Sequence, residues 1–532
     1  MAYINIIINI MNSLINSTIL QLRKRAEKYS SEQLVKTFVD VGPLFTLLTN
    51  PDHQILYGRR GTGKTHVLSC LSSKKRTEGH CSINIDLRTI GSNGGLYSDP
   101  NIEVSERATR LLVDTLSTIH NQILDFVLEN DERINLSIVG PILDSLAKEI
   151  TQVQILGPVE KEDIREQIKE NKRENSLLLS PDKFSLGIKG NVGVNNKIHQ
   201  RKSTTGIEKH RVHFPSIQNE FAKLINKITP SEIWVILDEW AEIPLDLQPF
   251  LGDLLRRTLF PTYGITVKIG AIEHRSNFKF FKSTSDYIGI EVGADMTSLN
   301  LDEYMVFENN EYLALDFFKN LIFRHINPLL PETEQIKYAD DLINQTFTQI
   351  SVFEEFVRAS EGVPRDAINI LVHAAMKANA NKITMGNIRD AARIWYNRDK
   401  ERSVMANPKA LQLLRWIIDE VIGNRNARAF LLRTDIENVL IDYLYDGRVI
   451  HIIKQSISGK DTPGMRYNVY SIDFGCYVDL INTTRAPKGL FQVETDEGDE
   501  VFASVPQNDY RTIRRAILNL EEFEKYLLAN ES

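Results

Sequence analysis

The stretch QILYGRRGTGKTHVL, residues 54–68, decides the fold. An apolar run at 55–57 is typical of a buried strand, and it leads straight into glycines, Lys64 and Thr65 in the spacing G-x-x-x-x-G-K-[ST]. The glycines let consecutive backbone N–H groups turn inward around a phosphate, where a Cβ would collide. Lys64 brings a positive charge to the β- and γ-phosphates, and Thr65 offers a hydroxyl to Mg²⁺. The helix that begins here directs its positive end at the nucleotide.

This stretch therefore predicts a phosphate loop with ATP and Mg²⁺ as cofactors. The residues expected to bind the nucleotide are Gly58, Arg59, Arg60, Gly61, Thr62, Gly63, Lys64, Thr65 and His66. The segment just ahead of such a loop often wraps the base, so residues 38–41, with Val41 at their end, are candidates for the adenine site. A plain packing segment at 38–41 is the alternative.

Composition sets broad limits on the protein. The 532 residues suffice for several domains, and the apolar content of 42% with 25% charged residues is that of an ordinary soluble globular protein. The net charge of −7 means that any contact with nucleic acid would come from a local basic patch. Three widely spaced cysteines, Cys70, Cys81 and Cys476, make neither a disulfide framework nor a metal site. We expect a cytoplasmic protein.

The first twenty residues are apolar, but asparagines interrupt them at positions 5, 9, 12 and 16. That is too polar for a membrane span. The basic cluster at 23–25 follows the apolar run, whereas a signal peptide carries its charge before it. Residues 1–37 are therefore expected to form a frayed or helical extension that does not enter a membrane. Met11 is an alternative start.

Strands alternate with helices along the next part of the chain. Residues 82–87, 233–237 and 265–272 read as buried strands, and residues 105–128 and 247–260 as helices. From Lys64 to Asp238 is 174 residues (238 − 64), whereas two strand–helix units need about 60–80. We expect an inserted segment at 131–214, with a charged helix at 160–174 followed by a twisted β-ribbon.

The remainder is first helical and then mixed. Residues 310–400 read as helices, one of them opening at the sequence GVPR, 362–365. Residues 407–481 follow the winged-helix order of helix, strand, helix and hairpin. A capping box at Thr434–Glu437 is expected to open the second helix, which stops at Gly447, and the hairpin's second strand to run from 467 to 481. A last helix is expected from about 510 to 528.

The predicted fold class is therefore α/β: a P-loop NTPase core with a parallel sheet and a helical lid, followed by an α+β winged-helix domain. The expected domains are an N-terminal extension (1–37), the core (38–300) with its insertion (131–214), the lid (301–405), and a winged-helix-like domain with a C-terminal helix (406–532).

Asp238 and Glu239 close a hydrophobic strand, at the edge of a parallel sheet where ligands bind. The first acid suits the Mg²⁺ shell, so Thr65 and Asp238 are the expected metal ligands. The second suits the positioning of the attacking water. Two adjacent carboxylates at the end of a buried strand need ligands, which disfavours a merely structural role.

Four arginines are candidates for contacts with phosphate. Arg365 lies in the first turn of a helix, where a cation opposes the helix dipole, so local stability does not explain it. A lid arginine that reaches the γ-phosphate would explain this position. A solvent-exposed arginine is the alternative. Arg275 follows the 265–272 strand and could sense the γ-phosphate. Arg256 and Arg257 could reach a neighbouring subunit as arginine fingers.

The segment 183–213 holds seven Lys and Arg residues and a single acid, Glu208. Apolar residues alternate there with polar ones, which favours a two-faced ribbon whose basic face lies on a DNA backbone. Solvated lysines on a loop are the alternative.

Together these motifs resemble the AAA+ and STAND branches of P-loop ATPases, and most closely the origin-recognition initiator type. The resemblance rests on GRRGTGKT (58–65) as Walker A, WVILDEW (234–240) as Walker B and GVPRDA (362–367) as the sensor 2 motif of the lid, and it covers about residues 38–480 without the insertion. It implies an ATPase core, a lid and a C-terminal winged helix.

Two features depart from the initiator pattern. The sequence EHR at 273–275 replaces the usual small polar sensor 1 and is closer to the STAND arginine. The expected recognition helix carries Asp435, Glu437, Asp442 and Asp446, which phosphates repel.

Two functions follow. The first is an ATP-hydrolysing machine that assembles on DNA, as in replication initiation, transposition or phage defence. The second is a STAND-like switch whose nucleotide state gates a protein partner with little turnover. Either would act as a homo-oligomer or with a protein partner. Glu239 disfavours a scaffold that only binds ATP.

Overall fold

The computed structural model describes residues 2–23, 29–90, 97, 99–156, 176–178, 207–228, 230–283, 286–307, 310–420, 429–458, 464–481, 492–494, 500–502 and 516–530. The chain forms two compact units. The loop unit comprises Met1–Leu47, Tyr57–Cys70 and Asn300–Ser532, and the sheet unit comprises Leu48–Leu56 and Leu71–Leu299. The expected domain boundaries at 37, 300 and 405 stay predictions.

The centre of the sheet unit is a five-stranded sheet in the order β10-β1-β7-β6-β2. Its strands β6 (Ile233–Asp238) and β7 (Ile265–Ala271) are almost entirely buried, which explains their mostly apolar sequences. β2 (Cys81–Asp86) pairs parallel with β6, and β6 pairs parallel with β7. β10 (Thr297–Asn300) and β2 lie at the two edges of the sheet, and β1 (Gln54–Tyr57) lies between β10 and β7. The predicted α/β class with a parallel sheet is confirmed.

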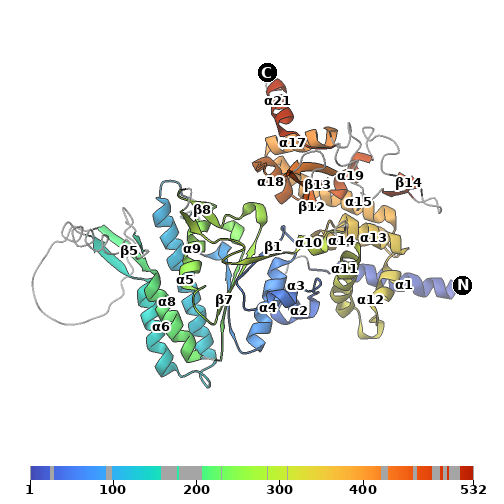
Figure 1. Cartoon of the computed structure of the whole chain (residues 1–532). Helices are drawn as coiled ribbons and strands as arrows, with labels where there is room; N and C mark the ends of the chain where they lie inside the picture. Colours follow the sequence, from blue (N-terminus) through green and yellow to red (C-terminus); the bar gives the residue numbers. More distant parts are fainter. Residues whose placement is uncertain are drawn as a thin grey trace, which may run out of the picture. The chain divides into compact units, whose positions relative to one another are not determined.

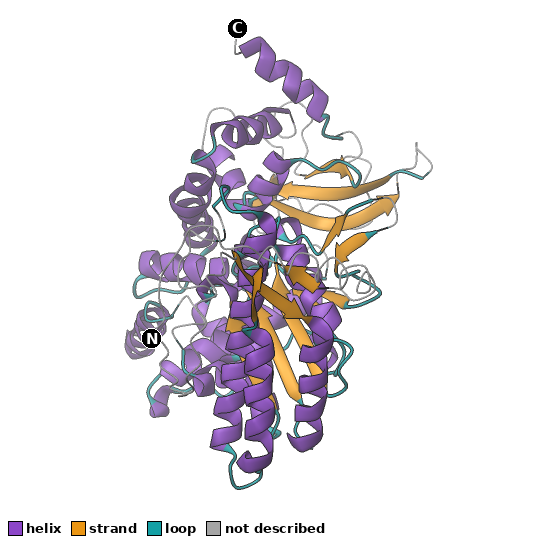
Figure 2. Ribbon diagram, turned by 90° about the vertical axis from the view of Figure 1, so that its left-hand side faces the viewer, coloured by secondary structure: helices purple, strands orange, loops and turns teal. Residues whose placement is uncertain are grey.

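Four helices of the sheet unit pack side by side (Figure 1): α5 (Val104–Glu129), α6 (Leu136–Ile150), α8 (Phe214–Ile228) and α9 (Gln248–Thr258). α5 buries a stripe that includes Leu112, Leu116, Ile119 and Ile123, as its apolar periodicity predicts. Figure 2 shows helices flanking the strands of this sheet. A small hairpin of β8 (Lys279–Phe281) and β9 (Tyr287–Gly289) follows β7.

The predicted insertion contains α6 and a three-stranded antiparallel sheet in the order β3-β5-β4. Its strands are β3 (Val153–Leu156), β4 (Ser176–Leu178) and β5 (Ile207–His213). β5 coincides with the end of the predicted basic ribbon. The predicted helix at 160–174 and the ribbon from 183 to 206 lie outside the described residues.

The loop unit contains the helical stretch predicted for residues 310–400. Its helices are α11 (Glu311–Ile326), α12 (Ala339–Thr346), α13 (Ile350–Ala359), α14 (Pro364–Ala378) and α15 (Met385–Trp395). The N-terminal helix α1 (Ala2–Ile19) packs against α11, α12 and α14, and the Asn16 side-chain amide donates to the carbonyls of Asn379 (2.6 Å) and Asn381 (2.9 Å). Among the described helices, none combines the length and the apolar character that crossing a membrane requires.

The C-terminal part of the loop unit follows the predicted element order. After α16 (Glu401–Met405) come α17 (Pro408–Ile417), β11 (Ala429–Arg433), α18 (Val439–Asp446), β12 (Ile450–Ser458) and β13 (Arg466–Ile472). The strands form an antiparallel sheet in the order β11-β13-β12. Helices and sheet share one apolar core, which includes Leu414, Phe430, Leu444, Ile450 and Tyr470.

Two details of this part differ from the prediction. The N-cap of α18 is Asn438, whose side chain accepts from Leu440 N and Ile441 N, so the predicted capping box at Thr434–Glu437 is wrong. The second hairpin strand ends at Ile472, and α19 (Phe474–Ile481) begins directly after it. The buried Asp473 carboxylate turns the chain there by accepting from Gly475 N (2.9 Å).

The last helix also starts later than predicted. Ala516 and Leu518 exchange backbone hydrogen bonds with Leu431 of β11, and α21 (Leu520–Asn530) begins after them. Residues 510–515 lie outside the described residues. Ahead of this segment, β14 (Gln492–Glu494) and β15 (Glu500–Phe502) pair antiparallel.

Candidate nucleotide-binding site

The phosphate loop connects β1 to α4 (Lys64–Thr77). Gly61 and Gly63 adopt φ angles of +90° and +100°, which side chains other than glycine rarely tolerate. A Cβ on Gly61 would also lie 2.9 Å from the Cβ of Arg365. Both glycines are therefore required by the backbone of the loop, as the motif predicts.

Lys64 opens α4 and its side chain returns across the loop. The ammonium donates to the carbonyls of Gly58 (2.7 Å) and Arg59 (3.2 Å), and the Thr62 hydroxyl donates to Arg59 O (2.9 Å). The Lys64 ammonium thus lies over the turn at which the motif predicts phosphate binding.

A mainly apolar pocket adjoins the loop within the same unit. Its lining combines the segment before β1 with the loop, the start of α4 and the region of residues 301–364: Thr37, Phe38, Val39, Val41, Thr62, Gly63, His66, Val67, Leu301, Met305, Phe317, Leu321 and Pro364. The rings of Phe38 and His66 lie 5.8 Å apart, and His66 Nε2 lies 2.7 Å from Leu34 O. The residues predicted to hold adenine and those predicted to hold phosphate therefore share one pocket.

Arg365, the predicted sensor arginine, lies in the first turn of α14. The Arg365 backbone N–H donates to Gly61 O (3.2 Å), so the sensor helix starts against the phosphate loop. Two left-handed residues precede it, Glu361 (φ +50°) and Gly362 (φ +73°). A Cβ on Gly362 would approach Met305 O to 2.9 Å. This turn therefore passes close to the backbone of Met305 and favours glycine.

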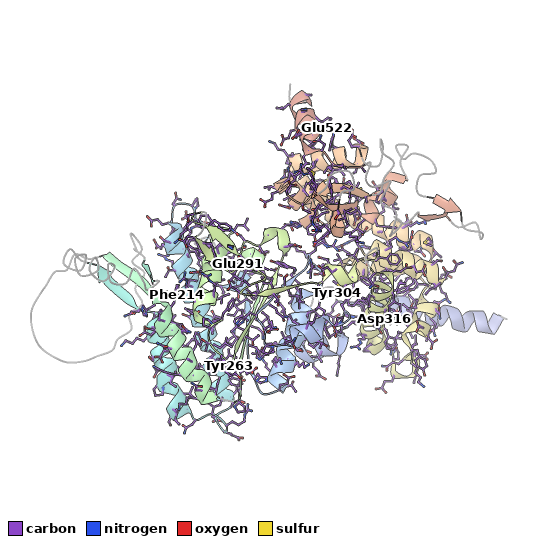
Figure 3. The ribbon with its side chains drawn as sticks, viewed as in Figure 1. Phe214, Tyr263, Glu291, Tyr304, Asp316 and Glu522 are labelled. Carbon is purple, nitrogen blue, oxygen red and sulfur yellow. The ribbon has the colours of Figure 1, made fainter. Side chains whose placement is uncertain are left out.

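Arg59 was predicted to bind nucleotide, but its guanidinium binds protein groups. Nε lies 2.9 Å from Asp302 Oδ1 in α10 (Asp302–Met305), the short helix in which Figure 3 labels Tyr304. Nη2 donates to Glu361 O (2.8 Å), and Nη1 donates to His451 Nδ1 in β12. The position of Arg59 in the motif does not indicate these partners. The neighbouring Arg60 is exposed.

The acidic pair belongs to the sheet unit. Asp238 is the last residue of β6, and Glu239 follows with φ 59° and ψ 43°, a left-handed conformation that costs a glutamate about 1–3 kcal/mol. Asp238 Oδ1 accepts from Glu239 N (2.9 Å). Backbone strain at a strand end of this kind clusters at functional sites.

Sequence reasoning missed two neighbours of this pair. Asp86 ends β2 directly opposite Asp238, and Arg88 pairs with Asp86 (2.6 Å) while its Nη1 lies 4.0 Å from Glu239 Oε1. Burial raises the pKa of Asp86, but Arg88 outweighs that effect and holds the pKa below its usual value. The position of Asp86 at the end of the strand beside β6 was the signal that could have found it.

The other predicted arginines have partners within the sheet unit. Arg275 ends the 3-10 turn η5 (Glu273–Arg275) after β7, and its carbonyl accepts from the buried Gln248 amide (3.2 Å). Arg256 and Arg257 both pair with Asp253, at 2.9 Å and 2.6 Å. Their roles as sensor and arginine fingers stay predictions.

Within the described parts of the chain, Glu361, His451 and Asp473 bring three potential metal ligands within 4.8 Å of one another. Two cations already occupy this cluster, because Arg59 contacts His451 and the Lys400 ammonium lies 2.5 Å from Asp473. Protein cations thus contact two of these ligands, and the Glu361 carboxylate accepts from Phe474 N (3.0 Å). The predicted Mg²⁺ ligands remain Thr65 and Asp238.

Comparison with known proteins supports the initiator resemblance. Residues 23–128 match the ORC-CDC6-like family, which confirms the predicted resemblance over a segment that contains the phosphate loop. The Orc1 protein of Aeropyrum pernix, solved in complex with DNA, aligns over 88% of this chain and 96% of its own length with 14% identity and a TM-score of 0.26. No curated protein matches the sequence.

Proposed function

We propose that this protein is an AAA+ type ATPase of the origin-recognition initiator kind, which binds and hydrolyses ATP and acts on or assembles with DNA. The observation that carries the proposal is the pocket that joins Phe38 and Val41 to Gly63 and His66 beside a phosphate loop of the required backbone geometry. An aromatic and aliphatic pocket suits a purine base, and the loop suits its phosphates.

The chemistry is assigned to a few side chains. Thr65 and Asp238 would hold Mg²⁺, which supplies charge neutralisation at the phosphates. Lys64 would stabilise the β- and γ-phosphates. Glu239 would orient the attacking water and accept its proton, and Arg365 from the lid would contact the γ-phosphate. Arg275 would sense the same phosphate.

DNA is proposed as the macromolecular partner. The ORC-CDC6-like match at residues 23–128 and the basic composition of residues 183–213 support it. The acidic residues of α18 argue against that helix as the reader of DNA, since phosphates repel Asp442 and Asp446. We propose a cytoplasmic protein that acts as a homo-oligomer or with a protein partner.

A nucleotide-gated switch with little turnover is the second candidate. The contacts of Arg59 and Glu361 with the C-terminal part of the loop unit favour it, because a switch needs nucleotide and a distant surface to be linked. The rate of ATP hydrolysis distinguishes the two candidate functions.

The test measures ATP hydrolysis and particle size together. Hydrolysis is followed with Mg²⁺, with and without DNA, for the parent, Glu239→Gln and the control Glu242→Gln, an exposed acid three residues on. Gel filtration with ATP, ADP and DNA reports assembly. We expect turnover in the parent and in the control, and an ATP-bound, inactive Glu239→Gln protein. Tight ATP binding by the parent without turnover would favour the switch, and no binding would refute both.

A further inference from the structure

The side chain of Arg59 is the least expected feature of the phosphate loop. It is 2% exposed, although it lies in a loop that is otherwise built for a ligand. Four segments of the loop unit meet on its guanidinium: α10 through Asp302, the turn before α14 through Glu361 O, β12 through His451, and α18 through the ring of Tyr445 at 5.8 Å. Removing the guanidinium would leave several buried acceptors unpaired.

The Arg59–His451 contact determines which ring nitrogen of the neutral imidazole carries the proton. Nδ1 accepts from Arg59, so the ring proton lies on Nε2, which donates to Asp473 Oδ2 (3.0 Å). Burial lowers the pKa of His451 to about 4, which keeps the ring neutral at pH 7. Burial would raise the pKa of Asp473, but Lys400 and His451 lower it to about 2. The arginine, the neutral imidazole and the carboxylate form one directional chain.

This chain continues to the residue after the sensor arginine. Asp473 also pairs with Lys400 (2.5 Å), which lies 3.0 Å from Asp366 Oδ2, and Asp366 in turn pairs with Arg448. Lys400 ends a π-helical turn, Tyr396–Lys400, a rare geometry that is frequent at functional sites. Asp366 directly follows Arg365, so the buried network reaches both the loop and the sensor helix.

A second route joins the same elements. The Glu361 carboxylate accepts from Phe474 N (3.0 Å) at the start of α19, while its carbonyl accepts from Arg59. Glu361 is left-handed, a conformation that persists only where surrounding contacts impose it. The contacts that impose it come from the phosphate loop and from the C-terminal part of the chain.

We propose that Arg59 is a positioning residue that couples nucleotide binding to α18, β12, β13 and α19 in the C-terminal part of the loop unit. In this role Arg59 does not contact nucleotide. It fixes the position of the loop relative to β12, and its network extends through Glu361 and Asp366 to α14. This inference rests on the proposed nucleotide binding, but it does not require turnover. Because coupling is reciprocal, nucleotide should order β12 and β13, and loosening them should weaken nucleotide binding.

The experiment uses the full chain and two substitutions that break the Arg59–His451 contact from either side. Arg59→Gln removes the guanidinium. His451→Gln places an amide nitrogen near the Nε2 position, which preserves donation to Asp473 but removes the Nδ1 acceptor. The control Arg402→Gln makes the same charge change at an exposed arginine of α16, outside the proposed nucleotide site, and Arg59→Lys is the conservative variant. ATP and ADP affinities are measured by titration, and hydrogen exchange of β12 and β13 is measured with and without each nucleotide.

We expect ATP to slow exchange in β12 and β13 of the parent and of Arg402→Gln. Arg59→Gln and His451→Gln should each weaken ATP binding by about tenfold and abolish this protection, and the double variant should be no weaker than either single one. Arg59→Lys should recover part of both effects.

The inference is overturned if the parent binds ATP without any change of exchange in these strands, which needs no variant to fold. It is also overturned if the effects of the two single substitutions add fully in the double variant, or if Arg402→Gln behaves like Arg59→Gln. In each of these results ATP binding, and with it the proposed function, would stand. A parent that binds neither ATP nor ADP would instead refute the proposed function and the coupling together.

Discussion

The backbone N–H of Arg365 donates to the carbonyl oxygen of Gly61 over 3.2 Å, so the first turn of the lid helix rests on the phosphate loop. This contact leaves no room for a side chain at Gly61, because a Cβ there would lie 2.9 Å from Arg365 Cβ and 3.1 Å from Val363 Cγ1. The phosphate loop and the first turn of α14 are therefore in direct contact.

Gly61→Ala should impair nucleotide binding. The substitution adds strain of about 1–3 kcal/mol at a left-handed φ and pushes α14 from the loop. Gly140→Ala in α6 is the matched control, since nothing lies within 4 Å of its added Cβ and alanine favours a helix. Titration with ATP and thermal unfolding check both variants. Equal ATP affinity in Gly61→Ala and the parent would contradict the role of this close approach.

Arg365→Ala should lose the preference for ATP over ADP. A charge-assisted contact with the γ-phosphate is worth about 10- to 100-fold in ATP affinity and nothing for ADP, which lacks that phosphate. Lys377→Ala, at the other end of α14, is the control. The measurement is the ratio of the two dissociation constants. A ratio unchanged from the parent would remove Arg365 from the site.

Phe38→Ala should weaken ATP and ADP binding alike by about tenfold, because stacking of an aromatic side chain on a base contributes about 1–3 kcal/mol and both nucleotides carry the base. Val35→Ala, on the exposed face of α2 (Ser31–Thr37), is the control. Competition between ATP and inorganic triphosphate adds a second readout, since triphosphate binding should not respond to Phe38. A decrease confined to ATP would point to the phosphates instead of the base.

Acid should destabilise the loop unit. Burial lowers the pKa of both His325 and His451 to about 4, against about 6.5 in an unfolded chain. Between these values the unfolded chain binds more protons, so stability is complete above pH 6.5 and falls as the pH drops toward 4. Each histidine lowers the free energy of unfolding by about 2 kcal/mol at pH 5.

Urea unfolding at pH 7 and pH 5 measures this dependence. His325→Phe should reduce the pH dependence by the share of that histidine. Identical pH dependence in the parent and His325→Phe would show that His325 does not stay neutral in the folded protein.

The basic segment 183–213 predicts a salt-dependent contact with DNA. Replacing Lys197, Arg201, Lys202 and Lys209 by Glu should weaken binding to every DNA sequence and flatten the salt dependence, by about 0.9 in logarithmic slope for each phosphate that the variant leaves without a cation. ATP hydrolysis without DNA should not change. A fourfold variant that binds DNA like the parent would direct attention to a protein partner.

Sequence patterns predicted the parts that local chemistry determines. Mostly apolar runs predicted β6 and β7, and the motif spacing predicted the left-handed glycines at 61 and 63. The errors arose where a distant contact decided the outcome. The apolar run after Ile472 looked like more strand, but Asp473 and Gly475 turn it into α19, where a Cβ on Gly475 would lie 2.5 Å from Ala392 O.

The partners of Arg59 were beyond prediction for the same reason. His451 lies 392 residues away in the chain, and no pattern near either residue marks the pair. A motif assigns a role by position, and this arginine occupies a position at which most side chains are compatible with the motif. Only the folded loop unit shows that its guanidinium belongs to an internal network.

The helix α1 sets a limit on how far the protein can be shortened. Asn16 donates to the two carbonyls that follow the sensor helix α14, and Ile15 and Ile19 are buried beside it. A truncated version that begins at Met11 would retain all of these interactions. One that begins at Ser30 would remove the donor of both carbonyls and expose the surface that α1 covers, so deletion of residues 1–29 should destabilise the helices that pack on α1.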